Sequence, residues 1–244
     1  MSGGYSILNT DAWSYFSYAS LAILIPSLYI ASRIIRDRPF SYYSSSRGGW
    51  NWKIYLKCLV IPLAINLIYY IGYALINGRV GPNRLTIPFF IICLILVPLQ
   101  CIAEEYLFRG FIMQTLGSWI KIPVVALIIQ AVLFTGGHMY SILGMIGILY
   151  DGIVLGFLAM YTKGLEAGSA LHTVNNLLLC YFVALGLGTS SLITIWDFIP
   201  GILVPLIYVM LEINTDGLMK KQMNVVWFRL CSYFFIYFFL FLWC

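Results

Sequence analysis

The chain has 244 residues, of which 61% are hydrophobic and 9% charged, and its mean hydropathy is +0.91. Because a soluble domain carries about a quarter charged residues, this composition predicts an integral membrane protein. The apolar runs are continuous rather than alternating, which favours helices over a β-barrel. Basic loops facing the cytoplasm and anionic lipid account for the net charge of +5, so no nucleic-acid partner is implied.

Turn-forming clusters divide the chain into a predicted all-α, polytopic bundle of about eight transmembrane helices. A helix needs about 20 mostly apolar residues to cross a membrane, and most of the runs are of that order. We treat residues 1–244 as a single integral membrane domain. The predicted helices cover roughly residues 12–35, 54–77, 86–116, 122–138, 141–162, 165–187, 192–213 and 226–243.

Basic residues collect in the odd-numbered connections between these helices. Six lie around the first connection, between residues 33 and 57, and others mark the third, fifth and seventh. The even-numbered connections contain only Arg79 and Arg84. Because basic loops stay on the cytoplasmic side, we expect the odd connections there and both termini outside.

Two adjacent acids and a base interrupt the third predicted helix, in the stretch "CIAEEYLFRGF" that begins at Cys101. An ionisable residue deep in a membrane is costly and therefore indicates function. Glu105 and Arg109 are four residues apart and can form a structural ion pair, whereas Glu104 points about 100° away. We expect Glu104 to be free to act as a base, although the spacing alone does not decide which acid reacts.

The two histidines of the chain lie in two other apolar segments, "LFTGGH" and "HTVNN". Asn176 follows His172 by four residues and shares its helix face. Since buried polar groups need partners, we expect these side chains to converge in a polar cavity within the membrane, open to the cytoplasm. The helix that carries His138 must then be short or tilted. The expected site residues are Glu104, Glu105, His138, His172 and Asn176.

This set of side chains is suited to amide hydrolysis, which needs a base for water, a proton donor for the leaving nitrogen and donors for the oxyanion. No serine or cysteine forms a nucleophile motif with a histidine, which favours activated water over an acyl-enzyme. His138, His172 and Glu104 could instead hold a zinc ion with an open position, so the cofactor is either none or zinc. The HExxH pattern is absent.

Each feature alone also has a structural interpretation. Glu105 and Arg109 could be a packing ion pair, His138 a helix-end residue bonded to a carbonyl, and His172 with Asn176 a polar contact between helices. The same cluster could serve a small transporter, although no inverted repeat is visible. Three such features in a chain with few polar residues favour one common site, and we interpret Asp151 as structural.

Three motifs resemble the boxes of the CAAX-protease and bacteriocin-processing family of intramembrane proteases, also called CPBP or Abi. "EEYLFRG", "FTGGH" and "HTVNN" resemble its EExxxR, FxxxH and HxxxN boxes, and the resemblance covers roughly residues 86–187, the expected catalytic core. It implies that Glu104 or Glu105 activates water with help from His138. It also implies that His172 and Asn176 stabilise the oxyanion and that Arg109 anchors the glutamate helix.

The resemblance further implies an intramembrane endopeptidase, either a metalloprotease or a metal-free glutamate protease. Its substrate would be a hydrophobic peptide or protein of the CAAX, lipidated or bacteriocin type, cleaved near the C-terminus. We expect a multi-pass protein of a bacterial plasma membrane, in contact with membrane lipids. The alternative is a non-proteolytic scaffold or bacteriocin self-immunity protein of the same fold.

Overall fold

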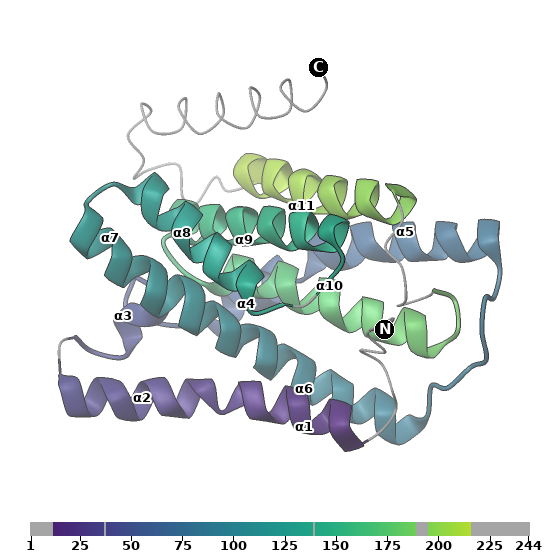
Figure 1. Cartoon of the computed structure of the whole chain (residues 1–244), viewed down its shortest axis with the longest axis horizontal. Helices are drawn as coiled ribbons and strands as arrows, with labels where there is room; N and C mark the ends of the chain where they lie inside the picture. Colours follow the sequence, from purple (N-terminus) through teal and green to yellow (C-terminus); the bar gives the residue numbers. More distant parts are fainter. Residues whose placement is uncertain (1–11, 37, 139, 189–194, 216–244) are drawn as a thin grey trace. The chain divides into compact units, whose positions relative to one another are not determined.

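The computed structural model describes residues 12–36, 38–138, 140–188 and 195–215, and the predicted helix at 226–243 lies outside them. The chain divides into two compact units, Met1–Val209 and Met210–Cys244, and the three motifs lie in the first. The regular elements are all helical (Figure 1). They are α1 (Ala12–Ala22), α2 (Leu24–Ile35), α3 (Ser41–Ser44), α4 (Trp52–Cys58), α5 (Val60–Asn77), α6 (Ile87–Glu105), the π-helix η1 (Tyr106–Met113), α7 (Gln114–Ile120), α8 (Pro123–Gly136), α9 (Ile142–Thr162), α10 (Glu166–Ala184) and α11 (Ile195–Thr215).

Four of the helical segments are long and apolar enough to cross a membrane, which makes this a multi-pass membrane protein. They cover Tyr15–Ile35, Trp52–Asn77, Ile87–Ile120 and Ile142–Thr162. The predicted all-helical fold is therefore confirmed, but α8 has only 14 residues, fewer than the roughly 20 that a span needs. The helix that carries FTGGH is thus short, as the expected meeting of the two histidines required.

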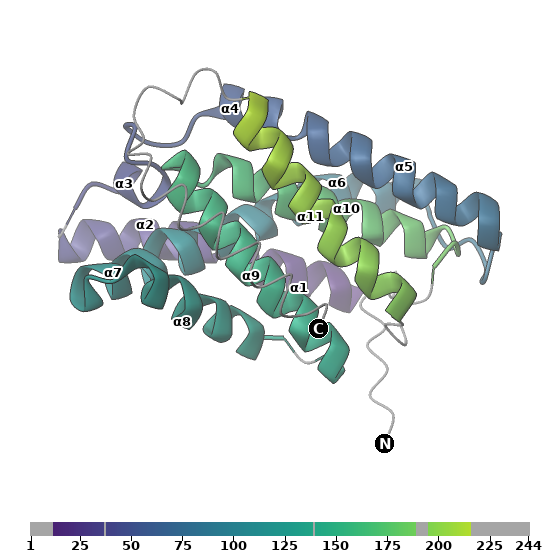
Figure 2. The same ribbon diagram turned by 90° about the horizontal axis from the view of Figure 1, so that it is seen from above.

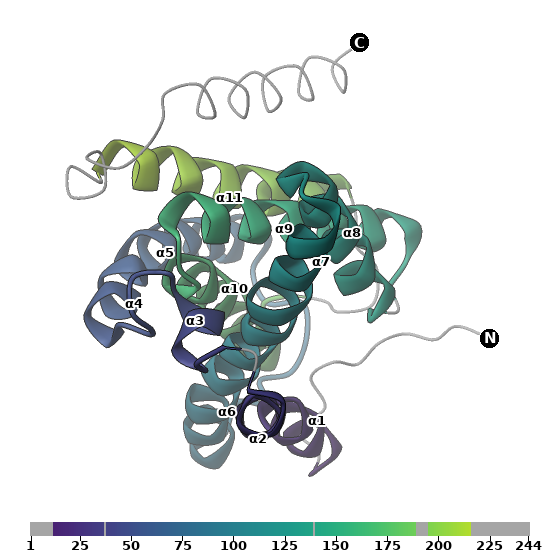
Figure 3. The same ribbon diagram turned by 90° about the vertical axis from the view of Figure 1, so that its left-hand side faces the viewer.

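The longest segment, Ile87–Ile120, is the element around which the others pack. α1 and α10 lie along α6, whereas α2, α3, α8 and α9 contact the π turn η1. Figures 1 and 3 both show α2 beside α6. The sequence did not predict the π turn, which is a rare wider coil found mostly at functional sites. It begins immediately after the two glutamates.

Two glycines on α9 allow α8 to approach closely, and Figure 2 shows these helices side by side. A Cβ atom added at Gly152 would lie 3.1 Å from the Cα atom of Ala131. A Cβ atom at Gly156 would collide with the side chains of Leu127 and Gln130. The spacing of four residues is the small-xxx-small pattern that permits close helix contacts in membranes.

The α2–α4 loop, residues 36–51, is anchored to the turn between α9 and α10. The buried carboxylate of Glu166 accepts hydrogen bonds from Arg47 Nη2 at 2.8 Å and from the Asn51 backbone N–H at 3.0 Å. The backbone N–H of Leu165 donates to the Ser44 carbonyl. Glu166 is the first residue of α10 and is fully buried, and its two hydrogen bonds hold this loop in place.

The same loop also contacts the π turn at Gly110. A Cβ atom at this position would lie 2.6 Å from the backbone carbonyl oxygen of Tyr43. Gln114, one turn further along, accepts a hydrogen bond from Arg38 at 2.9 Å. The loop therefore contacts both η1 and the start of α10, the two elements that carry the first and third motifs.

We predict that Gly110→Ala lowers the free energy of unfolding by about 1–3 kcal/mol, because the obstructing atom belongs to the backbone and has to shift. Gly72→Ala on α5 is the matched control, since no atom lies within 4 Å of its added Cβ. The control should stay within about 1 kcal/mol of the parent protein. Denaturant or thermal unfolding in detergent measures both, and equal stability of the two variants would contradict the loop contact.

Candidate active site

The centre of the candidate site is an ion pair between Glu105 and Arg109. Arg109 Nη1 donates to Glu105 Oε1 at 2.9 Å, and both side chains have no exposed surface. This confirms the pairing predicted from their spacing. The guanidinium also lies 4.3 Å from the centre of the Phe134 ring, so α8 contributes a cation–π contact.

A backbone carbonyl on α9 gives Arg109 a further partner. Arg109 Nη2 donates to the Gly152 oxygen at 3.3 Å, and Gln130 Nε2 donates to the same oxygen at 2.8 Å. A buried ion pair is stable only if additional hydrogen bonds offset the loss of water. Sequence reasoning missed Gln130, although a polar residue one turn before Phe134 in an apolar helix was a usable signal.

His172 lies between the two glutamates and connects α10 to the ion pair. Its Nδ1–H donates to Glu105 Oε1 at 3.0 Å, and its Nε2 lies 3.6 Å from Glu104 Oε2. Gly168, one turn earlier on α10, also lies beside Glu105, since an added Cβ would be in ordinary contact with Glu105 Oε2 at 3.4 Å. The hydrogen bond to Glu105 fixes the orientation of the ring and leaves Nε2 facing Glu104.

The two glutamates have different surroundings. Glu105 is fully buried. Its Oε1 accepts hydrogen bonds from both Arg109 and His172. Glu104 is 5% exposed, and its Oε1 accepts a hydrogen bond from Gln100 Nε2 at 3.0 Å. Its Oε2 has no hydrogen-bond partner in the described part of the chain. Oε2 of Glu105 also lacks a hydrogen-bond partner among the described residues, so the two acids differ in their donors: Glu104 is the acid without a cationic hydrogen-bond donor.

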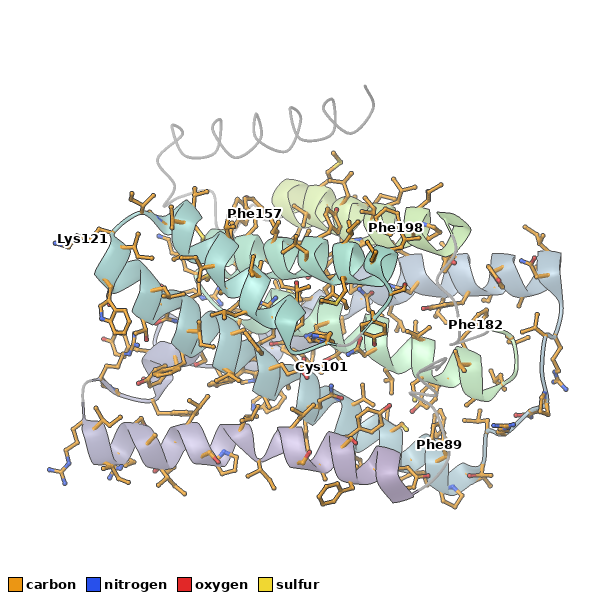
Figure 4. The ribbon with its side chains drawn as sticks, in the orientation of Figure 1. Phe89, Cys101, Lys121, Phe157, Phe182 and Phe198 are labelled. Carbon is orange, nitrogen blue, oxygen red and sulfur yellow. The ribbon has the colours of Figure 1, made fainter. Side chains whose placement is uncertain are left out.

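Asn176 lies one turn beyond His172 on α10, next to α6. Its side-chain Nδ2 is 3.5 Å from Cys101 Sγ, a weak acceptor, so the amide remains available to a better one. Cys101, labelled in Figure 4, lies on α6 three residues before Glu104. The neighbouring Asn175 instead accepts from Asn66 on α5 at 3.0 Å, which is a contact between helices.

His138 and His172 both pack against the ring of Phe134. Its Nδ1–H donates to the Phe134 carbonyl at 2.8 Å, and its ring centre is 4.8 Å from that of Phe134. The ring centres of Phe134 and His172 are 6.0 Å apart. The structure thus brings Glu104, Glu105, Arg109 and His172 together, with Asn176 one turn away and His138 in contact with the Phe134 ring that also packs against His172.

The residues present do not fit a bound zinc ion. Among the described residues, no three His, Cys, Asp or Glu side chains are grouped so that they could hold a metal. The arrangement instead offers a carboxylate oxygen beside a histidine nitrogen, which is suited to proton transfer.

Comparison with known proteins gives matches to a family and to a relative. Residues 86–178 match the family described as Type II CAAX prenyl endopeptidase Rce1-like, and this range contains all three motifs. The chain is 29% identical over 184 residues to "Uncharacterized protein YyaK" of Bacillus subtilis (strain 168), covering 69% of this chain. It spans 60% of the length of that relative. No solved structure matches the chain.

Substitution of the two glutamates should separate their structural roles. Glu105→Gln leaves the buried Arg109 without its counter-ion, so we expect a loss of about 3–5 kcal/mol in the free energy of unfolding. Glu104→Gln keeps an amide oxygen that can accept from Gln100, and it should cost less than about 1.5 kcal/mol. Unfolding curves in the same detergent test this difference, and a larger loss for Glu104→Gln would contradict the assignment.

Proposed function

Because residues 86–178 form a domain of the Rce1-like type II CAAX prenyl endopeptidase (CPBP) family, we propose that this protein is an intramembrane endopeptidase. It hydrolyses a peptide bond near the C-terminus of a hydrophobic CAAX-type, lipidated or bacteriocin-type peptide. One observation carries the proposal: His172 joins two buried glutamates, of which only Glu105 is bonded to an arginine. Glu104 is thereby left as a base beside an oriented histidine.

In the proposed reaction, Glu104 Oε2 takes a proton from a water molecule as the water oxygen attacks the scissile carbonyl carbon. The negative charge that develops on the carbonyl oxygen is held by the Asn176 amide, with His172 Nε2–H as a second donor when the ring is protonated. Collapse of the tetrahedral intermediate breaks the C–N bond, and Glu104 returns its proton to the leaving nitrogen. The products are a carboxylate and a free amine.

Glu105, Arg109 and His138 have supporting roles in this proposal. Glu105 orients His172 through Nδ1, and Arg109 holds Glu105 in place. The Phe134 carbonyl accepts from Nδ1 of His138, so Nε2 of the neutral ring is left as a proton acceptor. His138 would assist from its position against the Phe134 ring.

We also propose that the protein lies in the plasma membrane of a bacterial cell and that its site opens towards the cytoplasm. The first and fifth connections lie together. Ser45 and Ser46, in the loop before α4, donate hydrogen bonds to the carbonyl oxygen of Lys163, between α9 and α10. Even connections meet elsewhere, where the Val80 N–H donates to the Gly186 carbonyl. This grouping supports the topology in which the basic, odd connections face the cytoplasm.

Loss of the general base should abolish most of the activity. With a farnesylated CAAX-type peptide and protein in lipid nanodiscs, we expect Glu104→Gln to lower kcat by about 10²–10⁴-fold. The control Gly72→Ala should keep the parent rate. Its rate and unfolding midpoint together show whether purification and reconstitution of a variant reduce activity by themselves. Cleavage by the parent that persists in Glu104→Gln would reject Glu104 as the base. Absence of cleavage by the parent would favour the scaffold or immunity alternative.

Metal removal gives an independent test of the donor arrangement. We expect protein dialysed against EDTA and 1,10-phenanthroline to contain less than stoichiometric zinc and to cleave the same peptide at the untreated rate, because no metal ligand set is assembled among the described residues. Metal content by mass spectrometry and kcat are measured on one sample. A loss of activity that stoichiometric zinc restores would disprove the metal-free mechanism.

A further inference from the structure

Asp151 on α9 is a third acid within the membrane-spanning part of the chain, and the proposed reaction does not use it. In the part of the chain that the structure describes, its carboxylate has no hydrogen bond and no ion pair; its recorded interactions are electrostatic, with His172 and Arg109. An ionisable residue inside a membrane segment normally has a partner or a function. A structural role, which the sequence suggested, leaves this carboxylate unexplained.

The register of α9 and α10 places Asp151 level with His172. The two helices are joined by a short turn, residues 163–165, and therefore run antiparallel. Leu155 faces Gly168, since a Cβ atom on the glycine would lie 3.5 Å from the Leu155 carbonyl oxygen. One helical turn back along α9 from Leu155 is Asp151, and one turn forward along α10 from Gly168 is His172. The electrostatic interaction between these two residues agrees with that register.

Asp151 differs in exposure from the residues that share its helix face. Leu155 and Leu158 are 3% and 0% exposed, whereas Asp151 is partly exposed. Asp151 is thus less enclosed than the two leucines that follow it on this face. A ligand group that reaches His172 would find Asp151 accessible beside it.

The charges around this position favour a cation. Glu104, Glu105 and Asp151 are three carboxylates, and the cations near them are Arg109 and, when protonated, His172. When all three acids are ionised, negative charge is in excess in either state of the histidine. A low-dielectric region strongly favours a ligand that balances such an excess.

We propose that Asp151 is a specificity-determining residue that binds a cationic side chain, lysine or arginine, of the peptide next to the scissile bond. This inference rests on the proposed peptidase function, because it assumes that a peptide occupies the site. Asp151 acts on substrate selection rather than as the base, since Glu104 lies closer to the oriented Nε2 of His172.

The test uses N-acetylated, farnesylated CAAX-type peptides in which lysine or its uncharged analogue norleucine occupies each of the four positions before the prenylated cysteine in turn. The full-length protein in nanodiscs is compared with Asp151→Asn, Asp151→Glu and the control Glu166→Gln. The control also removes one buried carboxylate, but that of Glu166 is bound by Arg47 and Asn51. The readout is the ratio of kcat/KM for lysine over norleucine, in which the fraction of folded protein cancels.

At one position or more, we expect the parent to prefer lysine by at least about tenfold, the size of one charge-assisted contact. The ratio should fall to near one in Asp151→Asn and be retained in Asp151→Glu and Glu166→Gln. A parent without any lysine preference, or a preference that survives in Asp151→Asn, overturns the inference.

Peptide affinity, measured on Glu104→Gln alone and combined with Asp151→Asn, separates this inference from the proposed function. Lysine-dependent binding that needs Asp151 but leads to no cleavage by the parent would overturn the peptidase proposal and support the cation site. Cleavage without lysine preference would overturn the cation site alone. The absence of both binding and cleavage overturns both.

Discussion

The buried ion pair between Glu105 and Arg109 is the constraint on which the rest of the site depends. Neither side chain is exposed, so each needs hydrogen-bond partners from other parts of the protein in place of water. Arg109 takes the Gly152 carbonyl of α9 and the Phe134 ring of α8, and Glu105 takes His172 of α10. One charge pair thereby determines where three other helices lie against η1 and α6.

The pair also explains how two adjacent acids can differ in chemistry. Because they are neighbours on a helix, Glu104 and Glu105 point in different directions and meet different partners. Glu105 receives the guanidinium and the imidazole, whereas the hydrogen-bond donor to Glu104 is the neutral amide of Gln100. A site that needs one fixed anion and one reactive anion obtains both from consecutive residues. The proposed peptidase reaction uses this asymmetry.

Local patterns in the sequence predicted the helices and the contacts within one helix. Hydropathy located the long described helices but not the four-residue α3, and the spacing of Glu105 and Arg109 predicted their bond. The π turn could not be predicted, because it depends on the helices packed around it. The burial of Glu166 depends on Arg47, 119 residues earlier, and a helix-end position gave no sign of it. The packing of His138 and His172 against the same Phe134 ring is likewise a tertiary feature.

The position of both charges in one helix has a consequence for the biogenesis of the protein. An arginine and a glutamate four residues apart can neutralise each other as soon as the segment Ile87–Ile120 is synthesised, before α8, α9 and α10 exist. The segment can therefore enter the bilayer with two of its three charged residues already matched, which lowers the cost of helix insertion. His172 arrives later, on a helix whose polar residues make it a poor independent span. Its stable insertion then depends on docking against an anion that is already inside the membrane.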